Sequence, residues 1–331
     1  QGRGNRFTAI LDLRGNMGGE PMNSLKQAVQ TYARRHANSD GLVLTPVQGL
    51  RMMCLEAPAG DLHSVYKPLV CLVLQGAKRI LVGNQQKVLS AGQSAIVSAD
   101  MPVVGRIVQA SQSEPYLAIA VEIDMVILRE LTAHIGNAPA QSPSEMQTLF
   151  AQDTEAEVID CASRLMKLLD HPSSALLLRP GIMQELHYWL LAGPHGTALR
   201  DIADPGSYAS RLADAIAILR AEYTSRVSVE HLASKAGMSP SSFHKHFKHM
   251  TSLTPGQYQQ RLRLIEARRL MLDEGYSASN AAFEVGYESV SQFTREYGRL
   301  FQVSPKRDAL RYQKPLEVAN GGTVASQQIG A

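Results

Sequence analysis

The C-terminal third of the chain contains an internal repeat that constrains the fold more than any other feature of the sequence. Two segments offset by about 50 residues carry an alanine, a glycine and two aromatic residues four positions apart, in the same order. Each copy predicts a short helix, a turn at the glycine and a second helix whose aromatic residues face a core. The matched positions are Ala233 and Ala282, Gly237 and Gly286, Phe243 and Phe293, Phe247 and Tyr297, and the tripeptides Leu253-Thr254-Pro255 and Val303-Ser304-Pro305.

The residues at the ends of these helices fit the same interpretation. Ser239 followed by Pro240 is typical of a helix N-cap with proline in the first helical position. Ser289, with Gln292 three residues later, has the form of a capping box. We therefore expect each second helix to begin directly after its serine.

The opposite face of each second helix is polar, with side chains that hydrogen-bond base edges and phosphates. A polar face opposite an aromatic stripe is also typical of a solvated helix, but its duplication in a basic region favours DNA binding. Residues 207–313 contain 15 Lys and Arg against 10 Asp and Glu, whereas residues 1–206 contain 17 against 19. The polar residues are Ser241, His244, Lys245 and Lys248 in the first copy and Ser291, Gln292, Thr294 and Arg295 in the second.

Between the copies, Pro255 to Leu272 predicts one long helix that would hold the two units at a fixed separation. Two recognition helices held in this way would enter successive major grooves about one helical turn apart.

The segment from Ser210 to Tyr312 resembles the AraC/XylS family of transcription regulators. The residues that carry the resemblance are Leu232-Ala233, Gly237-Met238-Ser239, Phe243, Phe247, Pro255, Tyr258, Arg263, Ala267, Arg268, Leu270, Ala282, Val285-Gly286-Tyr287, Ser289, Phe293, Arg295, Phe301 and Ser304-Pro305. The chain departs from the family at Ser252 and Gln302, where glycine is usual, so an altered turn is expected there. It also departs at Glu296 and Gly298, where basic residues are common, which predicts weaker phosphate contact by the second unit.

The resemblance implies roles for the exposed residues. Ser241, His244 and Lys245 would read bases in the first copy, with Lys248 on a phosphate, and the four polar residues of the second copy are their equivalents. Arg211 and Arg263 are candidate phosphate contacts, although a solvated surface role fits each of them equally well.

The N-terminal part predicts a different architecture. Short apolar runs separated by turn signals between Gly41 and Val121 indicate an antiparallel sandwich or small barrel, preceded by a helix at Met22–Ala37 and followed by helices up to Leu191. The segment from Pro46 to Ile135 resembles the cupin-type sensor domain of the same family. The expected fold is therefore an α+β multidomain chain: a disordered leader at 1–20, a cupin-like β-barrel with flanking helices at 21–195, a linker at 196–207, an all-α double helix-turn-helix domain at 208–313 and a disordered tail at 314–331.

The predicted barrel offers little for metal or covalent chemistry. Its strand region contains only His63 among histidines, and Cys54, Cys71 and Cys161 are too far apart for a zinc site or a disulfide framework. We therefore expect no metal, no cofactor and no enzymatic activity, and instead a small organic effector inside the barrel. Candidate lining residues, each equally compatible with core packing, are Tyr66, Leu72, Leu74, Ile96 and Met101.

The expected partners are double-stranded DNA, a second copy of the chain, RNA polymerase and the effector, in the cytoplasm and without a membrane. Helices within Glu155–Leu191 are the expected self-association surface, through Ile159, Leu165, Leu168 and Leu169. Two alternatives stay open at this point. One is a cupin-like small-molecule binding protein or enzyme with a helical interaction module, and the other is an architectural protein that binds DNA without sequence preference.

Overall fold

The structure is a computed structural model that describes residues 19–38, 40–83, 85–135 and 148–313. The residue contacts divide the chain into two compact units, Gln1–Leu262 and Arg263–Ala331. The predicted tail and all but the end of the predicted leader lie outside the described residues. No described helix is long and apolar enough to cross a membrane.

Two antiparallel sheets form the N-terminal part of the first unit, as the short apolar runs predicted. One sheet has six strands in the order β1-β2-β9-β4-β7-β10, and the other has four in the order β3-β8-β5-β6. The strands are β1 (Leu42–Leu44), β2 (Leu50–Leu55), β3 (Ala59–Tyr66), β4 (Leu69–Gln75), β5 (Ala77–Val82), β6 (Gln85–Ser90), β7 (Gln93–Val97), β8 (Met101–Gln109), β9 (Tyr116–Glu122) and β10 (Leu149–Asp153).

The central strand β4 is buried on both faces, and its residues alternate between two cores. Leu72 packs with the helices that cover the six-stranded sheet, whereas Cys71 and Val73 pack with residues of the four-stranded sheet. The same alternation holds on β9, where Ile119 faces the helices and Ala118 faces the other sheet. The space between the sheets is therefore filled by side chains from both, as in a sandwich or flattened barrel.

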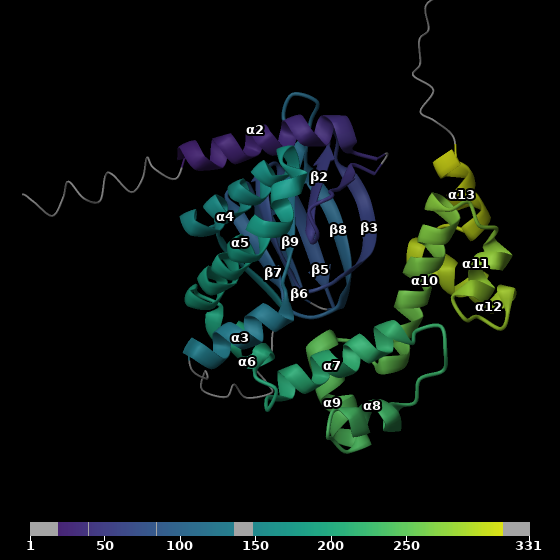
Figure 1. Cartoon of the computed structure of the whole chain (residues 1–331). Helices are drawn as coiled ribbons and strands as arrows, with labels where there is room; N and C mark the ends of the chain where they lie inside the picture. Colours follow the sequence, from purple (N-terminus) through teal and green to yellow (C-terminus); the bar gives the residue numbers. More distant parts are fainter. Residues whose placement is uncertain (1–18, 39, 84, 136–147, 314–331) are drawn as a thin grey trace, which may run out of the picture. The chain divides into compact units, whose positions relative to one another are not determined.

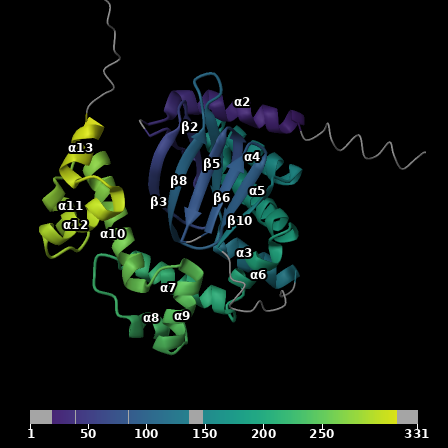
Figure 2. The ribbon, with the colours of Figure 1, turned by 180° about the vertical axis from the view of Figure 1, so that it is seen from behind.

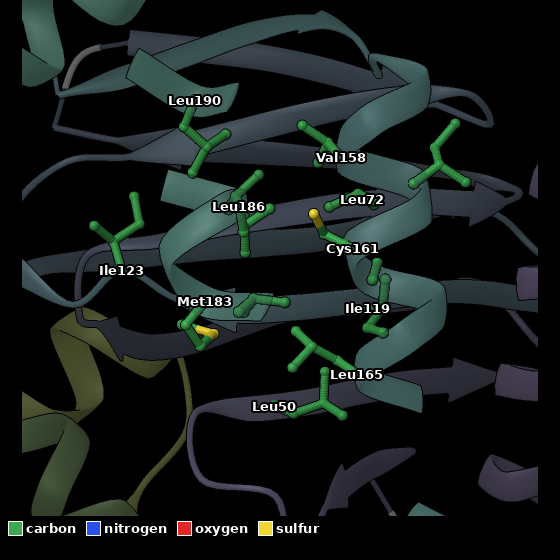
Figure 3. Close-up of a cluster of buried hydrophobic side chains, with 14 of the residues drawn as sticks. Leu50, Leu72, Ile119, Ile123, Val158, Cys161, Leu165, Met183, Leu186 and Leu190 are labelled. Atoms are coloured by element: carbon green, nitrogen blue, oxygen red, sulfur yellow. The ribbon is translucent and has the colours of Figure 1, made fainter. Parts of the chain in front are cut away.

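Helices cover the outer face of the six-stranded sheet. Figure 1 shows α2, α4 and α5 over this face, and Figure 3 shows leucines of α4 and α5 pointing at Leu72 and Ile119. Figure 2, from the opposite side, shows the four-stranded sheet. The helices before the repeat are α2 (Gly19–His36), α3 (Met125–Ile135), α4 (Ala156–Lys167), the 3-10 turn η2 (Leu168–Asp170), α5 (Pro172–Ala192) and α6 (Gly196–Ala203).

The predicted linker at 196–207 is largely helical, which corrects the expected boundary. Helix α6 occupies its first eight residues, and Leu199, Ile202 and Ala203 on one face of that helix are buried. Glycine and proline residues, which are typical of a linker, lie on both sides of this helix: Gly193 and Pro194 before it and Pro205 and Gly206 after it. The contacts also place the division between units at Leu262, well after the expected boundary near 207.

Three of the four predicted self-association residues are buried, and the fourth, Leu169, is half-buried and packs against the same core. Ile159, Leu165 and Leu168 are at most 4% exposed and belong to the core under α4. The sequence periodicity identified an apolar stripe correctly, but that stripe packs on the sheet and is not available to a partner. The exposed large hydrophobic residues of this region are Leu176, Leu177, Leu178 and Tyr188, all on α5.

The repeat region consists of helices, as predicted. Helix α10 is continuous and agrees with the expected helix at Pro255–Leu272. The helices are α7 (Tyr208–Ala221), α8 (Val229–Lys235), α9 (Pro240–Thr251), α10 (Pro255–Asp273), α11 (Ala278–Glu284), α12 (Val290–Phe301) and α13 (Pro305–Gln313).

Candidate nucleic-acid interface

The first copy of the repeat is a helix-turn-helix formed by α8 and α9. The hydroxyl of Ser228 caps α8 by accepting a hydrogen bond from the His231 backbone N–H, at 3.0 Å. Gly237 lies in the turn with φ of 62°, a positive value that glycine adopts without strain. Ser239 caps α9 by accepting from the Ser242 N–H at 3.2 Å. Pro240 occupies the first turn of α9, which confirms the predicted start of this helix.

The second copy, formed by α11 and α12, repeats these features. Ser277 and Ser289 cap the two helices, and Gly286 lies in the turn with φ of 86°. Only half of the predicted capping box forms. The Ser289 hydroxyl accepts from the Gln292 N–H at 3.3 Å, but the Gln292 side chain donates to Glu296 Oε1 at 3.1 Å rather than reaching back to the cap.

The aromatic pairs anchor both second helices, as the four-residue spacing predicted. Phe243 and Phe247 on α9 and Phe293 and Tyr297 on α12 are all 0% exposed. Their burial fixes which face of each helix is left to solvent. All eight polar residues predicted to contact DNA lie on those exposed faces: Ser241, His244, Lys245, Lys248, Ser291, Gln292, Thr294 and Arg295.

The two arginines predicted to contact phosphate lie beside the two turn glycines. Arg211 stacks over the ring of Tyr208, 4.7 Å from its centroid, and its Nη1 lies 3.3 Å from where a Cβ on Gly237 would be. Arg263 donates from Nη1 to the Gly286 carbonyl at 2.8 Å. Both guanidinium groups are half-buried, so each has a structural contact in its own copy, and phosphate binding by either stays a prediction.

The turns after α9 and α12 have a left-handed residue at the two positions where the family usually has glycine. Ser252 and Gln302 both have φ of 57°, the left-handed conformation of a helix C-cap. The altered turn expected from these substitutions is therefore absent at both positions, and non-glycine residues adopt the strained conformation instead.

The two recognition helices differ in charge. Helix α9 carries Lys245 and Lys248 and no acidic residue. Burial, followed by the neighbouring Lys245 and His249, lowers the pKa of His246, which disfavours a positive charge on this residue. In contrast, α12 carries Glu296, which accepts hydrogen bonds from the Tyr287 hydroxyl at 2.7 Å and from Gln292.

The candidate effector residues are divided between the two cores. Tyr66 and Met101 belong to the cluster between the sheets, whereas Leu72, Leu74 and Ile96 belong to the cluster under the helices. Contact of any of them with an effector stays a prediction. The described residues contain no group of three or more metal-binding side chains, and His63 lies half-buried on β3.

Sequence reasoning missed two sets of polar residues. Lys78 is 3% exposed and bonds to Tyr66 between the sheets, and Asp308 joins Tyr297 and Arg268 beside α12. Nothing in the local sequence marked these pairings. Lys78 stands next to Arg79 in a strand with no clear alternation, and Asp308 directly follows the exposed Lys306 and Arg307 in its helix.

Two family models match the chain and together cover more than two thirds of it. The N-terminus of AraC-type transcriptional regulators matches residues 46–198, and a helix-turn-helix domain matches residues 232–309. The chain is also 34% identical over 106 residues to the HTH-type transcriptional activator RhaS of Citrobacter koseri, and 34% identical over 97 residues to RhaS of Escherichia fergusonii. The first match covers 30% of this chain and 38% of RhaS, and the second covers 29% and 35%. The chain thus spans less than two fifths of the length of these relatives.

Solved structures of ToxT from Vibrio cholerae share the fold. An apo ToxT variant superimposes with a TM-score of 0.54 at 10% identity, covering 83% of this chain and 99% of ToxT. A second ToxT crystal structure gives a TM-score of 0.54, covering 81% of this chain and 100% of ToxT. The N-terminal double sheet, the duplicated helix-turn-helix and the two matched models assign this chain to the AraC/XylS family.

Proposed function

We propose that this protein is a transcription regulator that binds a specific DNA sequence through α9 and α12. The observation that carries the proposal is the duplicated helix-turn-helix, in which buried aromatic pairs leave equivalent polar faces exposed on both recognition helices. Serine, glutamine, lysine and arginine at these positions match the donors and acceptors of base edges and phosphates. A helix-turn-helix family model matches residues 232–309, and the chain is 34% identical over 106 residues to an HTH-type transcriptional activator.

The proposal has α9 and α12 enter successive major grooves of one duplex. Helix α10 is 19 residues long without a break and connects the two copies in the sequence. Lys248, Arg211 and Arg263 would add phosphate contacts. An activator would also contact RNA polymerase, and a protein that binds promoter DNA would act in the cytoplasm.

The N-terminal part would control this activity by binding a small effector, by forming a homodimer, or by both. One ToxT structure holds an unsaturated fatty acid, so a protein with this fold takes up a small organic molecule. Leu176, Leu177 and Leu178 are 84%, 82% and 55% exposed on α5. We propose this apolar patch as the dimer surface in place of the buried residues that the sequence suggested. A sensing role, rather than catalysis, fits a family of regulators.

Selection from a random duplex pool by the whole protein at about 150 mM salt tests the proposal. Enrichment of two conserved blocks about one helical turn apart is the expected result. Binding that depends on salt but not on sequence would instead identify an architectural protein, and no binding in the presence of effector candidates would favour a small-molecule binding protein.

Single substitutions then test the residues. Lys245→Ala and Arg295→Ala should each weaken binding to the selected duplex by about 1–3 kcal/mol, because each removes a base-reading contact. Lys87→Ala is the matched control, since Lys87 is an exposed lysine on β6 of the sandwich. Unchanged affinity in both recognition-helix variants would contradict the assignment.

A further inference from the structure

The side-chain amide of Gln292 is held in one orientation on the second recognition helix. Its nitrogen donates to Glu296 Oε1 at 3.1 Å, one turn further along α12. A carboxylate accepts hydrogen bonds and donates none, so only the nitrogen end of the amide can face Glu296. Glu296 therefore determines where the amide nitrogen and the carbonyl oxygen of Gln292 lie on the exposed face of α12.

Glu296 is itself fixed by a buried tyrosine. The Tyr287 hydroxyl donates to Glu296 Oε2 at 2.7 Å. Tyr287 is 5% exposed and packs edge to face on Phe293, with ring centroids 5.4 Å apart. Burial, followed by the bond to Glu296, raises the pKa of Tyr287, so the hydroxyl stays protonated and donates. The carboxylate that orients Gln292 is therefore tied to the core of the second copy.

Gln292 lies where a recognition helix meets base edges. Its backbone N–H donates to the capping hydroxyl of Ser289 at 3.3 Å, which places it in the first turn of α12. Recognition helices of this type contact bases with their N-terminal residues. The side chain of Gln292 is exposed. Glu296 takes one of its two amide hydrogens, which leaves the other hydrogen and the carbonyl oxygen for a base.

We propose that Gln292 reads an adenine in the major groove and that Glu296 is the positioning residue that sets this preference. The inference rests on the proposed DNA binding and names a base that α12 recognises. Adenine presents the acceptor N7 beside the N6 amino donor. A glutamine pairs with both, through one N–H and through its carbonyl oxygen.

A glutamine without this restraint would discriminate less between bases. By turning its amide over, it can donate to guanine or accept from the amino group of cytosine. Guanine presents two acceptors, O6 and N7, along the same edge. An amide with a fixed orientation would direct its carbonyl oxygen at one of them, so the restraint by Glu296 disfavours guanine.

The first copy does not carry this combination of residues. The positions equivalent to Tyr287, Gln292 and Glu296 hold Met238, Ser242 and His246. We therefore expect the contact between glutamine and adenine in only one of the two blocks of the recognised sequence, so the two blocks would differ.

Affinities of the full-length protein for pairs of duplexes test the proposal. The duplexes carry the sequence selected at about 150 mM salt, with each A·T pair replaced in turn by G·C. At one A·T pair, the unsubstituted protein should bind the A·T duplex about tenfold more tightly than the G·C duplex. Gln292→Ala should reduce this ratio to about twofold or less, because the A·T duplex loses both contacts.

Glu296→Gln separates a positioning role from a structural one. Glutamine at position 296 keeps the size of the side chain and pairs with the same neighbours, but its amide both donates and accepts, so Gln292 can turn over. The ratio should fall to about threefold or less, chiefly because the G·C duplex binds better, while Tm without DNA stays the same. Glu284→Gln, at an exposed position on α11, makes the same change in net charge and should keep the tenfold ratio.

The double variant Gln292→Ala/Glu296→Gln shows whether Glu296 acts through Gln292. Its ratio should equal that of Gln292→Ala alone. An unchanged ratio in Glu296→Gln, or no A·T preference that depends on Gln292, would overturn the proposal, while sequence-specific binding and the proposed function would stand. Binding of all sequences alike by the unsubstituted protein would overturn the proposed function, and this inference with it.

Discussion

The two helix-turn-helix copies share a backbone but differ in the pair of side chains that fastens each recognition helix to the helix after it. In the first copy this pair is aromatic: Phe247 of α9 and Tyr258 of α10 meet edge to face, with ring centroids 5.6 Å apart. In the second copy the equivalent pair is polar, because the Tyr297 hydroxyl donates to Asp308 Oδ2 at 2.6 Å.

The polar pair needs additional residues that the aromatic pair does not. Asp308 is 8% exposed, and Arg268 Nε lies 2.8 Å from its carboxylate, so the buried charge is compensated by an ion pair as well as by a hydroxyl. The guanidinium also stacks over the ring of Phe301, 5.1 Å from its centroid. The two copies therefore share their caps and turns, whereas the buried contact between helices differs in chemistry. A polar contact is tolerated there because each of its polar groups has a partner.

Removing the carboxylate from the second copy should have the largest effect. Asp308→Ala leaves Tyr297 and Arg268 without their acceptor, and we expect it to destabilise α12 and α13 by about 2–3 kcal/mol. Amide hydrogen exchange over residues 290–310 of the full chain would measure this loss as faster exchange. The first copy, residues 229–251, should keep its protection.

The matched variant in the first copy is Tyr258→Phe. It keeps the aromatic contact with Phe247 and removes only the hydrogen bond from the hydroxyl to the Asp100 carbonyl, at 2.6 Å. We expect a loss of about 1 kcal/mol. Equal losses in the two variants would show that the Asp308 carboxylate contributes no more than the single hydrogen bond of Tyr258, and would contradict the comparison.

The sequence predicted the duplicated part of the fold better than the rest, for a physical reason. Caps and turns are local: Ser239, Pro240 and Gly237 each determine the conformation of their own few residues, so their types indicate the structure directly. The pair of Tyr297 with Asp308 and the pair of Lys78 with Tyr66 depend on how distant elements pack, and no periodicity reports such contacts.

The two faces of the central strands show the same limit. Every residue of Leu69–Leu74 is buried, so the sequence of β4 contains no alternation of polar and apolar residues to separate its faces. The sequence therefore could not show that Leu72, a candidate effector residue, faces the helices while its neighbour Cys71 faces the other sheet. The short helix α6 escaped prediction because the Gly and Pro residues just before it are typical of a linker.

The turns after the recognition helices give a smaller contrast. Gln302 has a positive φ, and its side chain donates only to the carbonyl of Arg299 at 2.7 Å. Gln302→Gly should therefore stabilise the second copy by about 0.5–1 kcal/mol, because glycine adopts this conformation without strain. Gln302→Ala is the control: it removes the same side-chain contact but keeps the Cβ, so it should give no gain in thermal denaturation or hydrogen exchange.

The same substitution in the first copy should give less. Ser252 has the same φ, but a Cβ on Gly83 would lie 2.6 Å from the Ser252 Cβ, so this residue packs closely against the turn between β5 and β6. Ser252→Gly relieves the strain and loses that packing. A gain as large as that of Gln302→Gly would show that the packing contributes nothing to stability.

The smallest expected effect concerns the acidic residue that α12 has and α9 lacks. Glu296→Gln removes a negative charge from the second recognition helix, and the amide still pairs with Tyr287 and Gln292 because it both donates and accepts. Affinity for duplex DNA should rise about two- to threefold at low salt, and the gain should shrink as salt screens the charge. Glu157→Gln makes the same change in net charge at an exposed position on α4, far from the repeat in sequence. A gain in Glu296→Gln alone would place the repulsion between the carboxylate and DNA phosphate at α12 itself. The first copy, in which no acidic residue on α9 opposes Lys245 and Lys248, would then supply more of the binding energy. An equal gain in both variants would mean that only the net charge of the protein matters.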